Sequence, residues 1–107
     1  MAAVYKNAKV DLTTTGVTTL YTAPTTTTAV FKSIVVADDS GNTSTITLTL
    51  TDAASAVFVL YNVKATTANG TLELLTQPLV VQESEILKVT AADANRLHVI
   101  GSYLELS

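Results

Sequence analysis

The chain has 107 residues and a formal net charge of −3, and 48% of its residues are hydrophobic against only 14% charged. One domain fits this length, and folding would bury roughly 65% of the unfolded chain's surface. The scattered Lys and Arg residues form no basic stripe, the chain has no Cys, and no apolar run is long enough for a membrane span. We therefore expect no direct contact with nucleic acid, no membrane partner, no signal peptide at Met1, and neither disulfides nor Cys-ligated zinc.

Hydroxyl groups, rather than charges, supply much of the polarity. Twenty residues are Thr. A hydroxyl is neutral, can donate or accept a hydrogen bond, and is cheaper to desolvate than a charged group. A subunit that is permanently packed in an assembly tolerates such a surface better than a free monomer, which usually relies on charge for solubility.

Short stretches with alternating apolar and polar residues, separated by turn signals, follow one another along the whole chain. Residues 1–12 predict a first strand or edge strand, or an N-terminal arm. Further strands are predicted at 17–21, 29–37, 43–52, 56–63, 71–75, 79–81, 86–91 and 96–106. About eight or nine short strands at this spacing predict an all-β protein with a single antiparallel β-sandwich, jelly-roll or Ig-like, over residues 1–107.

The stretch from Thr43 to Asp52 shows the alternation most clearly, because Ile46, Leu48 and Leu50 alternate with Thr residues. Side chains on a strand point to opposite faces, so one face is apolar and the other carries hydroxyls. We expect the apolar face on the core and the Thr face toward water or a partner. We also expect this strand to form a hairpin with residues 29–37.

Two features predict surfaces for other subunits. The strand at 56–63 is partly apolar on both of its faces. The two terminal strands carry few of the charges that usually blunt a sheet edge, so we expect them to pair with each other or with a neighbouring subunit. The residues predicted to lie at such interfaces are Val4, Tyr5, Phe58, Leu60, Arg96 and Tyr103.

No pattern indicates catalysis, and we expect no catalytic residue, no metal site and no cofactor. His98 is the only histidine, and acid–base chemistry needs a second group within reach. Asp38, Asp39, Asn42 and Asp52 could supply oxygen ligands for calcium, but turn formation explains them better. Arg96 fits either a solvated turn or a carboxylate on another subunit.

Several phrases of the sequence resemble small virion structural proteins of tailed bacteriophages. They are Leu20 to Pro24, Ala29 to Val36, Thr43 to Asp52, Thr71 to Leu75, Leu79 to Val81, Ile86 to Thr90 and Ser102 to Glu105. The resemblance covers nearly the whole chain and lies in core and turn positions, so it transfers no functional residue.

This resemblance implies a β-sandwich without enzyme activity that is present in many copies per particle. It implies a capsid decoration (cement) protein that stabilises the phage head by bridging major capsid proteins. Such a protein is a homo-oligomer, expected here as a trimer, made in the host cytoplasm and located on the capsid surface of the virion. A neck or tail component of the phage is the alternative within the same particle. A carbohydrate-binding β-sandwich module is the alternative from another class.

Overall fold

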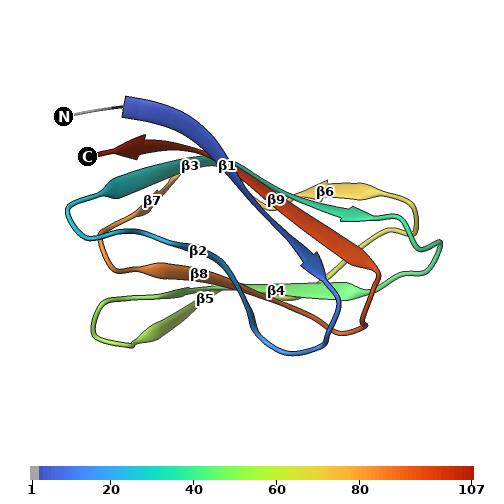
Figure 1. Ribbon diagram of the computed structural model, residues 1–107. Helices are drawn as coiled ribbons and strands as arrows, with labels where there is room; N and C mark the ends of the chain where they lie inside the picture. Colours follow the sequence, from blue (N-terminus) through green and yellow to red (C-terminus); the bar gives the residue numbers. More distant parts are fainter. Residues whose placement is uncertain (1–2) are drawn as a thin grey trace.

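The computed structural model describes residues 3–107, which contain nine β-strands and no helix (Figure 1). The strands are β1 (Ala3–Leu12), β2 (Thr18–Thr22), β3 (Thr28–Asp38), β4 (Thr45–Thr51), β5 (Val57–Ala65), β6 (Thr71–Glu73), β7 (Leu79–Val81), β8 (Ile86–Ala91) and β9 (Leu97–Leu106). The predicted all-β class is confirmed. Met1 and Ala2, which belong to the predicted segment 1–12 and domain 1–107, lie outside the described residues.

The strands form two antiparallel sheets that face each other as a β-sandwich. Sheet A has the order β1-β9-β3-β6, with β7 also paired to β3, and sheet B has the order β2-β8-β4-β5. β6 and β7 pair with the two ends of the same side of β3, so together they act as one interrupted strand. The interruption contains Pro78, which has no backbone donor for a sheet.

The pairing of early with late strands decides between the two predicted architectures. β1 pairs with β9, β2 with β8, β3 with β6 and β7, and β4 with β5. The chain therefore wraps as a folded-over ribbon, which is the arrangement of a jelly roll and not of an Ig-like sandwich. β1 pairs with β9 from Ala3 to Leu12, so its described residues form an edge strand and not a free arm.

The predicted hairpin between residues 29–37 and Thr43–Asp52 is wrong. β3 belongs to sheet A and β4 to sheet B, so the connection crosses from one layer to the other. Its turn does contain the predicted left-handed residue, Gly41, with φ of 79°. Asp38 is buried at the end of β3, where it accepts hydrogen bonds from Ser40 and Thr66 and so holds this crossing in place.

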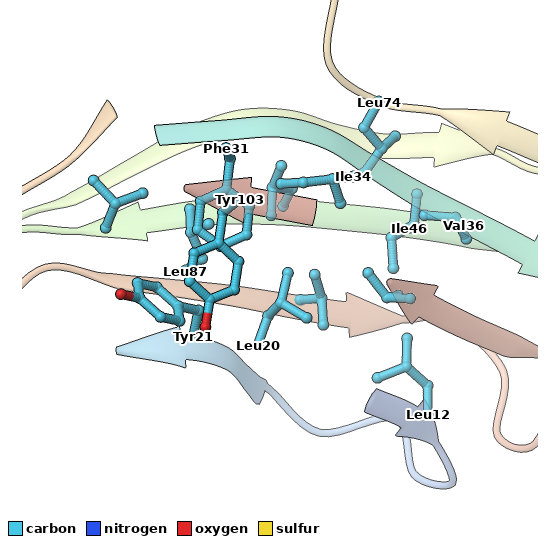
Figure 2. Packing of buried hydrophobic residues seen from close by; sticks show 14 of the residues in the cluster. Leu12, Leu20, Tyr21, Phe31, Ile34, Val36, Ile46, Leu74, Leu87 and Tyr103 are labelled. Carbon is cyan, nitrogen blue, oxygen red and sulfur yellow. The ribbon is translucent and has the colours of Figure 1, made fainter. Parts of the chain in front are cut away.

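The core between the sheets is built from alternate residues of nearly every strand (Figure 2). At one end, the rings of Tyr21, Phe31 and Tyr103 pack together, with centroids 4.6–5.2 Å apart. Tyr21 belongs to β2, which carries one residue more than β8 beside it, and both Leu20 and Tyr21 are buried there. A bulge of this kind re-aims a side chain that strict alternation would leave outside.

The start of β1, the end of β9 and the turn between β4 and β5 lie at the same end of the sandwich, on the left of Figure 1. We call this the terminal end. Six of the nine exposed large apolar side chains in residues 3–107 come from strand segments at this end, while the connections β1–β2, β3–β4, β5–β6 and β8–β9 lie at the other. They are Val4, Tyr5, Val57, Phe58, Val59 and Val80.

Substitution of Gly101 tests the aromatic part of the core. A Cβ atom at this position would lie 2.6 Å from Cε2 of Phe31, which forces the ring out of its stack on Tyr103. We expect Gly101→Ala to lower the free energy of unfolding by about 1–3 kcal/mol. Urea unfolding measures this change.

Gly16→Ala is the matched control, because its new Cβ would meet only the Thr14 hydroxyl at 3.6 Å. The control should leave stability unchanged or raise it by less than about 1 kcal/mol. Equal effects of the two substitutions would contradict the packing described here.

Candidate interaction surfaces

The structure separates the residues that the sequence predicts at interfaces. Val4 and Tyr5 lie on β1, at one edge of sheet A, and both are exposed. Phe58 and Leu60 lie on β5, at the edge of sheet B on the opposite side of the sandwich. A single flat contact therefore cannot use β1 and β5 together, and the two edges are separate candidate surfaces.

Two of the predicted interface residues are engaged within the chain. Tyr103 is only 7% exposed, and its ring stacks on Phe31 in the core, so it offers no side chain to a partner. Arg96 donates a hydrogen bond to the carbonyl of Thr43 at 2.8 Å and lies 3.3 Å from a carboxylate oxygen of Asp93. The guanidinium thus ties the β8–β9 turn to the residues before β4.

The β5 edge is the most apolar exposed strand of the molecule. Val57, Phe58, Val59 and Val63 are exposed, and Phe58 is on the opposite side of the strand from Val57 and Val59. No charged residue occurs from Ala53 to Val63. A groove of about 260 Å³ lies beside it, lined by Leu60 and Tyr61 of β5 and by residues 75–79. Exposed apolar side chains that gather along one edge in this way indicate a contact surface.

β5 is irregular along the same edge. It has one residue more than β4 between Val59 and Tyr61, and again between Tyr61 and Lys64. Val63 adopts a φ of 52°, a left-handed conformation that is costly for a β-branched residue. Its backbone N–H donates to the Thr47 hydroxyl of β4 at 3.1 Å. The outer edge is therefore regular only at its start, in Val57–Val59.

The outer face of sheet A presents a second apolar surface. One row crosses all of its strands through directly paired residues: Tyr5, Leu104, Val30 and Val80. A second row runs through Lys9, Ile100, Val35 and Glu73. Tyr5 is 76%, Val80 49% and Ile100 43% exposed. We call these eight residues the sheet A face. The middle of each row is apolar, and the second row has a cation at the β1 edge and an anion at the β6 edge. The residues between the two rows are polar: Asn7, Ser102, Ser33 and the exposed Lys32 at the bulge of β3.

The Thr residues of β4 line part of a shallow hollow on the outer face of sheet B. Thr45 and Thr47 are half-buried, and with Thr15 and Thr90 they surround a space of about 330 Å³ beside Val63. The lining includes no aromatic ring on which a sugar could stack. The hollow therefore gives no support to the carbohydrate-binding alternative.

A polar cluster closes the terminal end beside the aromatic core. Glu105 accepts hydrogen bonds from Lys6 Nζ at 2.8 Å and from the Tyr21 hydroxyl at 2.7 Å. The hydrogen bond from Lys6, followed by that from Tyr21, lowers the pKa of Glu105 below its ordinary value. Burial raises the pKa of Tyr21 well above its usual value, and its bond to Glu105 raises it further. The cluster ties β1 and β9 of sheet A to β2 of sheet B.

A second polar cluster lies at the other end. Burial alone would raise the pKa of Asp38, but hydrogen bonds from Ser40 and Thr66 and the nearby charge of Arg96 hold it below its ordinary value. The Asp38 side chain thus stabilises the turn after β3, as predicted.

Asp52 has a similar role in the β4–β5 turn, at the terminal end. Its carboxylate accepts hydrogen bonds from the backbone N–H groups of Ala54 and Ala56.

His98 lies between two carboxylates, with Nδ1 3.4 Å from Asp11 and Nε2 3.3 Å from Asp39. Its two nitrogens face different acidic residues, so one ion could not be shared by all three groups. Within residues 3–107 no cluster of three or more His, Asp or Glu side chains has the geometry of a metal site. Nor does that part of the chain contain a helix that could span a membrane.

In comparisons with known proteins, neither the protein-family models nor the curated proteins give a match to this chain.

Several exposed apolar residues were not predicted from the sequence as parts of a surface. Val57, Val59 and Val63 belong to the strand whose two apolar faces did signal an interface. Val80 and Ile100 carried a weaker signal, because each alternates with buried residues on its own strand. Only the strand order places them with Tyr5 and Lys9 on one face.

The ionisation of Glu105 makes the free energy of unfolding depend on pH. Because its pKa is lower in the folded protein, its contribution is present above the ordinary carboxyl range, about pH 4.5, and is lost as pH falls below it. We expect Glu105→Gln to flatten the decline of unfolding free energy between about pH 5 and pH 3. Asp38 shifts in the same direction, so part of the decline should remain.

Urea unfolding at several pH values measures this decline. Lys6→Met removes the main hydrogen-bond donor to the same carboxylate and should also flatten it. A decline as steep as in the unchanged protein, in both variants, would contradict the role given to this cluster.

The conformation of Val63 predicts a stabilising substitution. Asn tolerates the left-handed region, so we expect Val63→Asn to raise the free energy of unfolding by about 0.5–1 kcal/mol. Val59→Asn is the control, because Val59 is equally exposed on the same strand without a positive φ. Thermal unfolding should show higher stability for Val63→Asn only. Lower stability in both variants would argue against strain at Val63.

Proposed function

We propose that this protein is a non-enzymatic structural protein of a bacteriophage virion, a decoration protein that binds the capsid surface and bridges major capsid proteins. The β5 edge is the observation that carries the proposal. Its exposed apolar side chains, in a stretch without charged residues from Ala53 to Val63, form a surface that is unfavourable in water and that a neighbouring protein would cover.

The rest of the molecule fits such a role. The jelly roll occurs in viral capsid proteins, although the same fold serves unrelated functions and is a weak argument alone. The side-chain hydrogen bonds of the two polar clusters are used to join strands and turns. A protein attached in many copies stabilises a shell because each contact must be broken before the shell opens.

The β5 edge gives the proposal a direct test. Phe58→Glu places a charge in the middle of the apolar stretch, and we expect it to weaken attachment to the capsid about tenfold or more. Val17→Glu is the matched control, because Val17 is an exposed apolar residue before β2, outside the β5 edge. Co-sedimentation with capsids that lack the protein measures the attachment of both variants.

Reconstruction of the virions decides where the protein lies. Density for the sandwich repeated over the shell supports decoration, and density at a single vertex supports a neck or tail component. Absence of the chain from purified particles would overturn the proposal.

A further inference from the structure

We propose that two copies of this chain associate by antiparallel pairing of their β1 strands, which joins the two A sheets into one continuous sheet. The two-fold axis passes between the Asn7 residues, so Asn7 pairs with Asn7 of the second copy and Ala3 pairs with Asp11. The contact is isologous, so each copy contributes the same residues. It concerns how copies bind each other and does not depend on the proposed attachment to a capsid.

The other borders of the two sheets are irregular, whereas β1 is not. β2 and β5 carry bulges, and the border made by β6 and β7 is interrupted at Pro78. Bulges, short strands and Pro are devices that prevent an edge from pairing with another chain. β1 instead pairs with β9 from Ala3 to Leu12 in unbroken register. Among the described strands, it is therefore the border that suits an added strand.

Alternate residues of β1 direct their backbone groups to the free side. The carbonyl of Leu12 faces β9, because it accepts a hydrogen bond at 2.8 Å from the N–H of Asn95, just before that strand. The direction of the backbone groups reverses at each residue of a strand, so those of Asp11 face away from β9. The same holds for every second residue back to Ala3. Paired with a second copy, these residues form about ten hydrogen bonds, as many as a typical protein interface.

The register through Asn7 also matches side chains. Tyr5, which is 76% exposed, lies opposite Lys9 of the second copy, so the lysine stem covers the ring and its ammonium group faces the π system. Val4, which is 46% exposed, lies opposite Val10. Each pair occurs twice. Both exposed large apolar residues of β1 thereby gain a partner.

Other registers are less favourable. An axis at Lys6 or at Lys9 would place like charges directly opposite each other, which destabilises a pair of strands. An axis at Ala8 would bring Tyr5 opposite the Asp11 carboxylate, so that the negative face of the ring meets an anion. An axis nearer either end of β1 would leave much of the strand unpaired.

The lysines of β1 do not guard this border. Lys6 forms an ion pair with Glu105 of its own chain at 2.8 Å, and Lys9 donates a hydrogen bond to the Asn7 side chain at 3.2 Å. The side chains of a strand point to the two faces of its sheet and not toward the next strand. Pairing at β1 therefore buries neither ammonium group without a partner.

Asn7→Pro tests the contact, because it removes an N–H that faces the free side and is not used in pairing with β9. Sedimentation over a dilution series should show the unchanged protein at twice 11.2 kDa. We expect Asn7→Pro to raise the dissociation constant at least about tenfold, and Asn7→Thr, which keeps the N–H, to change it little. Val57→Pro makes the same change at the start of β5 and should have no effect.

A disulfide tests the register. The chain has no Cys, and Asn7→Cys places two thiols on Cα atoms about 5.5 Å apart across the axis, a distance that a disulfide spans. Oxidised glutathione should then join two copies, as a non-reducing gel would show. Lys9→Cys is the matched control, because its two copies would lie about 14 Å apart along the strands and should stay reduced.

Four results would overturn this contact. They are a monomer at about 100 µM, a trimer, a dimer that Asn7→Pro leaves unchanged, and a dimer that Lys9→Cys crosslinks as readily as Asn7→Cys. None of these results bears on whether the chain is found in virions, which is tested separately.

Discussion

Two sheets share a single interior, and this limits how much of an apolar chain can be buried. Each strand directs alternate residues inward, and the core takes them, including Phe31, Ile34, Leu48 and Val99. The alternate residues must then face outward. With only 14% charged residues, the chain fills these outward positions with Thr and with apolar side chains. The exposed apolar surfaces therefore follow directly from the composition and the layer architecture.

The spacing of strands and turns was predictable from local patterns. The alternation from Thr45 to Thr49 and the buried series on β9 appear in the structure as they do in the sequence, whereas Thr51, which was expected on the outer Thr face, is buried. The hairpin between β3 and β4 was predicted wrongly because Asp, Ser, Gly and Asn favour a turn whether the chain returns in the same sheet or crosses to the other. Turn chemistry fixes the local backbone, whereas sheet assignment depends on strands far away in the sequence.

For the candidate surfaces, too, the sequence predicted the local pattern but not the arrangement of distant strands. The apolar character of β5 on both sides was visible in the sequence and indicated an interface. Tyr103 gave the same signal as Tyr5, but one lies in the core and the other on the surface. They lie on adjacent paired strands with opposite orientation, which only the register of β1 and β9 establishes. The sheet A face needed still more, because its rows combine residues from strands separated by up to about a hundred positions.

The two apolar surfaces differ in what kind of contact they permit. An added strand needs a regular series of free backbone groups, and the bulges of β5 leave that series intact only over Val57–Val59. The edge is thus guarded against extensive pairing by its geometry rather than by charge. Contacts at β5 must rely on its side chains, which a shaped pocket on another protein can select. The sheet A face differs from it, because its inner strands β9 and β3 are hydrogen-bonded on both sides, so a contact there must use side chains alone. Because these two surfaces lie on different parts of one sandwich, a contact at one of them leaves the other accessible.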